Sequence, residues 1–247
     1  MPSLTLPGRL IWFAHCPKAG GTSVEQLMVA TWGEAVGHLH WGWDLWWRRG
    51  GWRLADPPNS PQHLTWEDAR ARLPRPPDAV FAVVRDPAAR MASEHRWQRR
   101  GRRATKMGRI LAFLPFPLWS RLMLAVAARH PHAFDNHFRP QSDFVPEGAR
   151  VFRLEEGLAP VAAWLAQASG EALLAPLPHA IPTERSGRGR MAPQETALFA
   201  RVFATDYHRF GYPCPPGAAG DPRRPVLDRL ARTLAPLVAA LDRRGRL

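Results

Sequence analysis

The chain has 247 residues, enough for one large α/β domain or two small ones with a proper hydrophobic core. Apolar residues make up 45% and charged residues 22%, which is ordinary for a globular protein and excludes a disordered, collagenous or coiled-coil chain. Lys and Arg outnumber Asp and Glu by 34 to 21, and the net charge of +13 predicts that the partner or substrate is an anion.

The first predicted elements are a strand, a glycine turn and a helix. Residues 10–14 form a short apolar run of strand formers, and apolar residues between 24 and 31 recur at helical spacing. Residues 15–23, His-Cys-Pro-Lys-Ala-Gly-Gly-Thr-Ser, connect the two. Residues 37–66 contain a tryptophan cluster and a Pro-rich stretch, and we expect them to form loops with little regular structure.

The middle of the chain repeats the pattern of strand and helix. Residues 79–84 are apolar without alternation, which is typical of a strand in a parallel sheet. Asp86 and Pro87 follow as the N-cap and first residue of a helix that we expect to reach about residue 99. The other elements expected here are a helical pair broken at 115–117, a third strand and a third helix, at residues 106–133, 150–154 and 158–168.

The last third of the chain is predicted to be mainly helical. A polar, Arg-rich loop at 179–192 precedes a helix at 194–207. A Pro/Gly linker at 213–225 then precedes an amphipathic helix at 226–241, in which Pro236 predicts a kink. Strands that alternate with helices predict an α/β fold on a parallel sheet. We expect a main domain over residues 1–212, with the linker and C-terminal helix (213–247) packed on it or extending from it.

Residues 15–23 have the features of a phosphate-binding loop. Glycines between a strand and a helix expose backbone N–H groups to an anion, and the helix dipole adds to the attraction. Lys18 adds a point charge, and Thr22 and Ser23 add hydroxyls. In a Walker A loop the lysine follows the glycines and a Ser or Thr binds magnesium, whereas here Lys18 precedes Gly20. This order disfavours a nucleoside triphosphatase; a tight turn without a ligand is the other interpretation.

A second motif covers residues 85–93, Arg-Asp-Pro-Ala-Ala-Arg-Met-Ala-Ser. Arg85 lies where a buried strand ends, and ligands bind at such strand ends in open α/β sheets. Its guanidinium fork matches phosphate oxygens, and Ser93, about two turns into the helix, can share one phosphate with it. The alternative is that Arg85 pairs with a carboxylate and Ser93 is a surface hydroxyl.

Together, the two motifs resemble those of the sulfotransferases that use 3′-phosphoadenosine 5′-phosphosulfate (PAPS), whose loops read H-x-P-K-x-G-G-T-S and R-D-P-x-x-R-x-x-S. Softer matches at residues 136–144 and 206–212 are similar to stretches of the bacterial and carbohydrate-type branch. The resemblance covers residues 10–212. It implies a P-loop-like α/β fold, with a central parallel sheet flanked by helices, and sulfuryl transfer from PAPS that yields adenosine 3′,5′-bisphosphate without a metal.

The resemblance also implies roles for individual residues. Lys18 would stabilise the charge that develops on the leaving phosphate, which suits a compact ammonium; it is one of two lysines in an Arg-dominated chain. Backbone N–H groups around the glycines would stabilise the same charge. The residues expected to bind the donor are those of the first loop, those of the second motif and two of the late basic loop: Lys18, Ala19, Gly20, Gly21, Thr22, Ser23, Arg85, Ser93, Arg185 and Ser186. For the late loop, a solvated segment without this role is an equal alternative.

A general base must take the proton of the acceptor hydroxyl, and histidine is the natural candidate. In family members with a histidine base, that residue lies about twenty positions ahead of the 3′-phosphate arginine, and His63 lies 22 ahead of Arg85. We therefore assign the base to His63 and expect His15 to pack beside the loop. The alternative bases are His38, His40, Glu25 and Glu67. His38 and His40 also resemble a metal-binding pair, but no further ligand cluster supports zinc.

The acceptor is expected to be a hydroxyl of a carbohydrate or glycolipid. The tryptophans at 41–52 are either a sugar-stacking surface or part of the core. The basic run at 96–109 is either a solvated helix end or a surface for an anionic glycan, lipid or nucleic acid. Two other functions remain open: a phosphate-loop kinase that needs Mg-ATP, and a basic nucleic-acid-binding protein, which no motif supports.

The sequence also suggests a compartment. Cys16 and Cys214 cannot build a disulfide framework, which favours a reducing environment, and we find no secretory signal. The longest apolar stretch, 110–128, is interrupted by prolines and Arg121, which argues against a single spanning helix. We expect a cytoplasmic protein, with membrane-surface contact through 106–128 left open, and the oligomeric state is undetermined.

Overall fold

The computed structural model describes residues 2–37, 59–71, 75–101, 106–174 and 191–243. The chain groups into two compact units. The first combines Met1–Arg85 with Gln141–Thr183, and the second combines Asp86–Pro140 with Glu184–Leu247. Each unit is therefore built from two separate stretches of chain. The predicted division at residue 212 remains a prediction.

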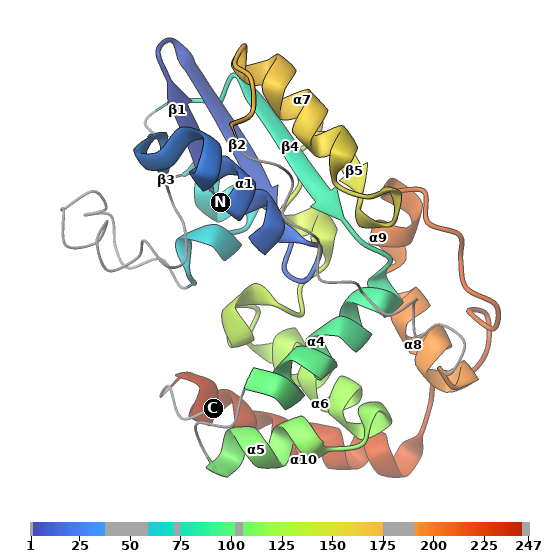
Figure 1. Ribbon diagram of the computed structural model, residues 1–247. Coiled ribbons are helices and arrows are strands. Elements are labelled where there is room, and N and C mark those ends of the chain that lie inside the picture. Colours follow the sequence, from blue (N-terminus) through green and yellow to red (C-terminus); the bar gives the residue numbers. More distant parts are fainter. Residues whose placement is uncertain (1, 38–58, 72–74, 102–105, 175–190, 244–247) are drawn as a thin grey trace. The chain divides into compact units, whose positions relative to one another are not determined.

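The first unit contains a five-stranded mixed sheet (Figure 1). Its strands are β1 (Ser3–Leu6), β2 (Arg9–His15), β3 (Val36–Gly37), β4 (Ala79–Val84) and β5 (Arg150–Arg153). Their order is β3-β1-β2-β4-β5. Strands β2, β4 and β5 are parallel neighbours, which confirms the three predicted strands. The sheet as a whole is mixed and not parallel as expected, because β1 runs antiparallel to both β2 and β3.

The sequence does not indicate the antiparallel pair, because its strands and its turn are short. Only two residues, Pro7 and Gly8, separate β1 from β2, and Gly8 takes the left-handed φ of 71° that such a tight reversal requires. The four residues of β1 are too few to show a clear period. Pairing places Ser3 opposite Trp12 and Leu6 opposite Arg9.

Two helices cover one face of this sheet, α1 (Gly21–Trp32) and α7 (Ala159–Ser169). Alternate strand residues point to this side, so Phe13 and Phe81 join the same buried cluster as Leu27 of α1 and Leu165 of α7. Trp12 points to the other side, where its ring meets Trp66 of α3 (Trp66–Arg70) at 6.1 Å between centroids. The short turns of this unit are η1 (Gly33–Ala35), η2 (Pro61–His63), η4 (Gln141–Asp143) and η5 (Leu154–Glu156).

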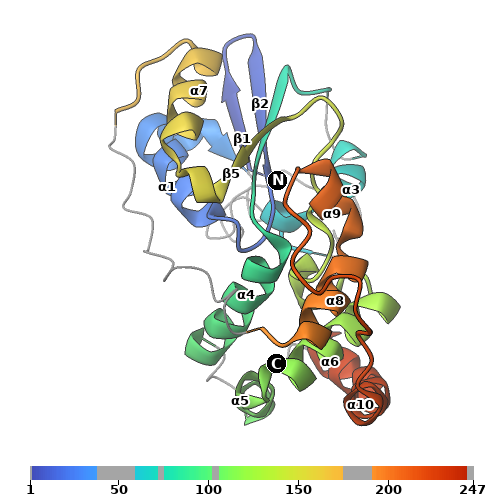
Figure 2. The same cartoon turned by 90° about the vertical axis from the view of Figure 1, so that its right-hand side faces the viewer.

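The second unit is helical in its described part (Figure 2). Its helices are α4 (Pro87–Gly101), α5 (Lys106–Phe113), α6 (Phe116–Arg129), α8 (Pro193–Val202), α9 (Ala204–Arg209) and α10 (Pro225–Arg243), with a short turn η3 (Ala133–Asn136). Asp86 caps α4 as predicted, since its Oδ1 accepts a hydrogen bond of 2.9 Å from the N–H of Ala89. The predicted break between α5 and α6 is confirmed. The helix expected at 194–207 is two helices that meet at Phe203.

A buried arginine holds the helices of the second unit together. Arg121 of α6 pairs with Glu195 of α8 at 2.7 Å and with Asp228 of α10 at 2.9 Å. Helix α10 packs along α6, and Pro236 lies within it. Among the described residues, no helix is both long and apolar enough to cross a lipid bilayer.

Candidate functional site

The loop between β2 and α1 has a backbone that glycine makes possible. Lys18 and Gly20 both take left-handed conformations, with φ of 65° and 85°. Gly20 is the N-cap of α1 and has no side chain, so no side-chain hydrogen bond covers the start of this 12-residue helix. Its carbonyl accepts the N–H groups of Ser23 and Val24 at 3.1 and 3.4 Å. The helix start thus presents backbone N–H groups and the positive end of a dipole without a built-in acceptor side chain.

The buried side chain of His15 packs against the loop between β2 and α1. His15, the last residue of β2, is 5% exposed, and its Nδ1 lies 2.7 Å from Oε1 of Glu25, which is 2% exposed. A Cβ on Gly21 would lie only 2.0 Å from Nε2 of His15, so a side chain at position 21 does not fit. His15 therefore packs beside the loop as expected. Glu25, one of the alternative bases, is engaged with His15 instead.

Arg85, the first residue of the second motif, meets the first loop at the ends of two neighbouring strands. Strands β2 and β4 are parallel and adjacent, so the residues after each lie at the same edge of the sheet. Arg85 directly follows β4, and its Nη1 donates a hydrogen bond of 3.4 Å to the carbonyl oxygen of Lys18. The Arg85 side chain is buried, with the residue 6% exposed. Arg85, the first residue of the second motif, thus lies beside the first loop, although it is 67 residues from Lys18 in the sequence.

Gln141 fixes the backbone of Arg85, a role that the sequence did not reveal. The Gln141 side chain accepts from the N–H of Arg85 at 2.8 Å and donates to its carbonyl at 2.8 Å. The residue is fully buried, and its own carbonyl lies 3.9 Å from Sγ of Cys16, in the first loop. The resemblance at 136–144 was the available signal, but it gave no role to this amide.

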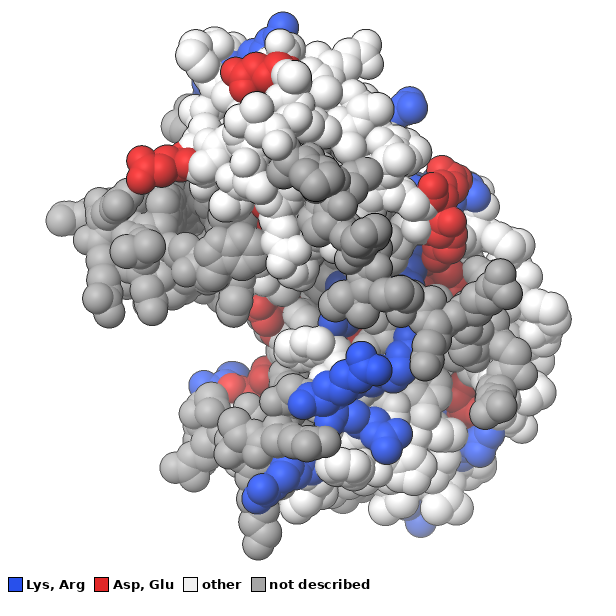
Figure 3. All heavy atoms as spheres, in the orientation of Figure 1, with Lys and Arg blue, Asp and Glu red and all other residues white. Residues whose placement is uncertain are grey.

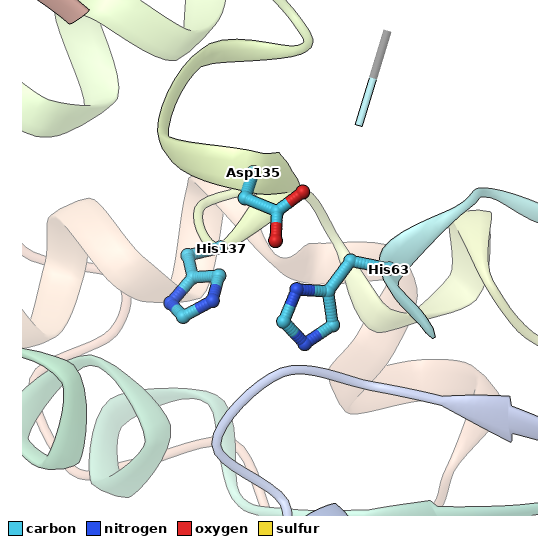
Figure 4. A group of neighbouring side chains, drawn as sticks. All are labelled: His63, Asp135 and His137. Atoms are coloured by element: carbon cyan, nitrogen blue, oxygen red, sulfur yellow. The ribbon is translucent and has the colours of Figure 1, made fainter. Parts of the chain in front are cut away.

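His63, the proposed base, lies beside His15. It is the last residue of turn η2 and is buried. Its ring meets the ring of His15 edge to face, with 4.9 Å between centroids. Its Nδ1 lies 3.3 Å from Oγ of Ser60 (Figure 4 shows the ring at the end of its turn). Turn η2 thus brings His63 next to the histidine that supports the helix start, although the two are 48 residues apart.

The remainder of the second motif belongs to the second unit. Ser93 lies half-buried on α4, and its predicted contact with a phosphate remains a prediction. Arg90 is structural: it is buried, and it donates to the carbonyls of His137 and Arg139 at 2.9 and 2.7 Å. His137 itself pairs through Nδ1 with the buried Glu94 at 2.8 Å. In Figure 4, His137 and Asp135 are drawn on their own segment, where residues 134–136 have positive φ.

Other predicted positions are exposed or lie outside the described residues. Glu67, an alternative base, is exposed on α3 beside Arg70. Figure 3 shows Lys and Arg side chains gathered over α4, whose last turn exposes Arg99 and Arg100, as a solvated helix end would. The predicted residues not described are His38, His40, Arg185 and Ser186, together with the tryptophans at 41–52.

The arrangement in the first unit suits an anion. It combines an ammonium group on Lys18, a guanidinium on Arg85 and a helix start that has no capping side chain. His63, a buried histidine whose Nδ1 lies near the hydroxyl of Ser60, contacts the ring of His15, which packs against the loop. Comparison of the chain with protein-family models, with curated proteins and with solved structures finds no match.

Proposed function

We propose that this protein is a sulfotransferase that moves a sulfuryl group from PAPS to an acceptor hydroxyl, of a carbohydrate or a glycolipid. The observation that carries the proposal is the contact between Arg85 and the carbonyl of Lys18. The two motifs of the resemblance were identified separately in the sequence. A donor with a 5′-phosphosulfate and a 3′-phosphate requires that both lie at one site.

The residues at this edge fit such a donor. Gly21 leaves no room for a side chain, since a Cβ there would lie 2.0 Å from Nε2 of His15, and Gly20 has a left-handed φ of 85° that residues with side chains rarely adopt. Backbone N–H groups are then the donors that the loop offers to the 5′-phosphosulfate. Arg85 offers the guanidinium fork for the 3′-phosphate. Ser93, Arg185 and Ser186 complete the proposed donor contacts on the basis of the resemblance alone.

The side chains divide the work of the transfer between them. When bound, PAPS supplies the sulfuryl group. Lys18 and the N–H groups at the start of α1 stabilise the negative charge on the phosphate that is left behind. His63 receives the proton of the acceptor hydroxyl as that oxygen becomes bonded to sulfur. With its Nδ1 facing Ser60, Nε2 is the nitrogen assigned to this proton.

Calorimetric titration with adenosine 3′,5′-bisphosphate, the expected product, tests the donor site. We expect tight binding without a metal and weak binding of Mg-ATP. Arg85→Gln should weaken the bisphosphate at least tenfold, because the 3′-phosphate loses a charged, bidentate partner. Arg75→Gln is the matched control: Arg75 is a half-exposed arginine of the same unit that pairs with Asp78 at 2.9 Å.

Each other outcome has a definite meaning. Binding of Mg-ATP alone would replace the proposal with the kinase alternative. Equal losses of affinity in Arg85→Gln and Arg75→Gln would mean that bisphosphate binding depends only on the overall charge of the protein. If neither nucleotide bound, the proposal would fail, and salt-dependent binding of DNA or RNA would become the function to examine.

A further inference from the structure

Helix α10 has an apolar side that its own unit does not cover. The side packed along α6 is made of small residues, with Ala231, Ala235, Val238 and Ala239 buried. Four larger apolar residues remain exposed: Val226 (71%), Leu230 (44%), Leu234 (37%) and Leu237 (55%). Their spacing of four, four and three places them on one side of the helix. Single exposed apolar residues are common, whereas an aligned row of four on one side of a helix is characteristic of an interaction surface.

The charges of α10 are divided by sign. Both of its acidic side chains are engaged within the unit. Asp228 accepts from Arg121 and from the N–H of Arg224, each at 2.9 Å, and Asp242 accepts from the N–H of Phe134 at 2.7 Å. Arg229 and Arg232 are exposed. From residue 223 to residue 247 the sequence has seven arginines against these two acids. The outward charge of the helix is therefore positive.

A second helix of this unit has the same character. Ile110 and Phe113 of α5 are 49% and 59% exposed, and Arg109 beside them is exposed. Figures 1 and 2 draw both helices at the lower end of the view, and Figure 2 shows them apart from one another. Apolar side chains flanked by arginines thus occur on two separate helices of this unit.

We propose that α10 binds the surface of an anionic lipid bilayer, with its four exposed apolar residues in the interface and its arginines on the headgroup phosphates. An apolar row flanked by arginines is the pattern of an interfacial helix, which lies in the plane of the membrane without crossing it. A second copy of this chain fits less well, because a symmetric contact would bring the exposed arginines of both copies together. The inference is independent of the proposed function.

Vesicle co-sedimentation of the full chain tests this surface. The probes are vesicles of phosphatidylcholine alone and vesicles that contain about one third phosphatidylserine. We expect binding only to the anionic vesicles. The double variant Val226→Ser/Leu237→Ser should bind at least tenfold more weakly, because it keeps every charge and loses apolar area. The control is Leu174→Ser, which removes a 78% exposed leucine of the first unit.

A charge variant provides a second, independent measurement. Arg229→Gln/Arg232→Gln should lower the partition coefficient about fivefold for each arginine removed, and more salt should reduce that difference. Equal binding of the wild type and Val226→Ser/Leu237→Ser would overturn the proposal, since attraction to the net charge of +13 would then suffice. Absence of binding to anionic vesicles would overturn it too. Sedimentation equilibrium that shows a dimer broken by Val226→Ser/Leu237→Ser would assign the surface to a second copy instead.

Discussion

Gly21 is the residue at which the candidate site has least room for change. Gly21→Ala would place a methyl group against the ring of His15, which cannot move without disturbing its buried pair with Glu25. We expect a loss of about 1–3 kcal/mol in the free energy of unfolding, the usual cost of overpacking, together with weaker binding of adenosine 3′,5′-bisphosphate. Urea unfolding and calorimetry measure the two effects. Gln26→Ala, on the exposed side of the same helix, is the control and should change neither.

For a substitution at His63 we predict a large loss of sulfuryl transfer with little loss of bisphosphate binding. In His63→Asn the proposed donor contacts of Lys18 and Arg85 remain, so the affinity for the bisphosphate should stay within about twofold. Transfer of labelled sulfate from PAPS to a panel of oligosaccharides and glycolipids should fall by about 10²–10⁴, the usual contribution of a general base. His208→Asn, at an exposed position on α9, should transfer normally. A fully active His63→Asn would move the base to His38, His40 or a glutamate.

The sequence could predict a contact between residues that follow neighbouring strands, but it could not predict contacts between individual buried side chains. The meeting of Lys18 with Arg85 follows from two adjacent parallel strands, each followed by a motif residue, and an apolar run predicts such strands. The pair of His15 with Glu25 depends on a ring packed under a glycine, and no periodicity encodes that contact. The backbone clamp that Gln141 forms on Arg85 joins residues 56 positions apart, and a single buried amide has no distinctive spacing.

At the scale of elements, long and strongly patterned segments were predictable and short ones were not. The strand at 79–84 is buried on both sides for most of its length, and its continuous apolar run showed this. Prolines correctly predicted the break before α6. Strands β1 and β3 have four and two residues, so they carry too little pattern. The break at Phe203 has neither glycine nor proline to indicate it.

The buried pair of Arg121 with Glu195 links α6 with α8, and the sequence pattern gives no sign of this contact. Arg121→Met removes the charge with little change in volume and leaves Glu195, which is 1% exposed, with Arg224 at 3.0 Å as its remaining charged partner. We expect a loss of about 3–5 kcal/mol in the free energy of unfolding, as for other broken buried pairs. Thermal and urea unfolding of the full chain measure it. Adding Glu195→Gln should recover part of the loss, because the uncompensated charge is then removed.

An exposed ion pair of the same unit is the contrast for this prediction. Arg223 and Asp221 lie 2.8 Å apart, and the hydrogen bond from Arg223 lowers the pKa of Asp221 to about 2. Both side chains are mostly exposed, so water and salt screen their attraction. Arg223→Gln should therefore leave the unfolding transition unchanged. If Arg121→Met also left the unfolding transition unchanged, the buried cluster would not hold α6, α8 and α10 together.

At the scale of the whole molecule, the net charge of +13 attracts any anion, and a site must be distinguished from that field. Salt separates the two, because exposed charges are screened over about 10 Å at 0.1 M ionic strength whereas a buried contact is screened much less. Raising NaCl from about 0.05 to 0.3 M should therefore weaken bisphosphate binding by similar factors in the wild type and in Arg85→Gln.

The ratio between the two affinities is the informative quantity. Arg85 is buried at the edge of the sheet, so the wild type should keep its advantage of at least tenfold at every salt concentration. Arg75→Gln, which alters only the exposed charge, should approach the wild type as salt rises. Calorimetry at three salt concentrations measures all three proteins. If the ratio for Arg85→Gln also fell towards one, the bisphosphate would be held by the overall charge of the protein, and the sheet edge where Arg85 meets the first loop would not be its binding site.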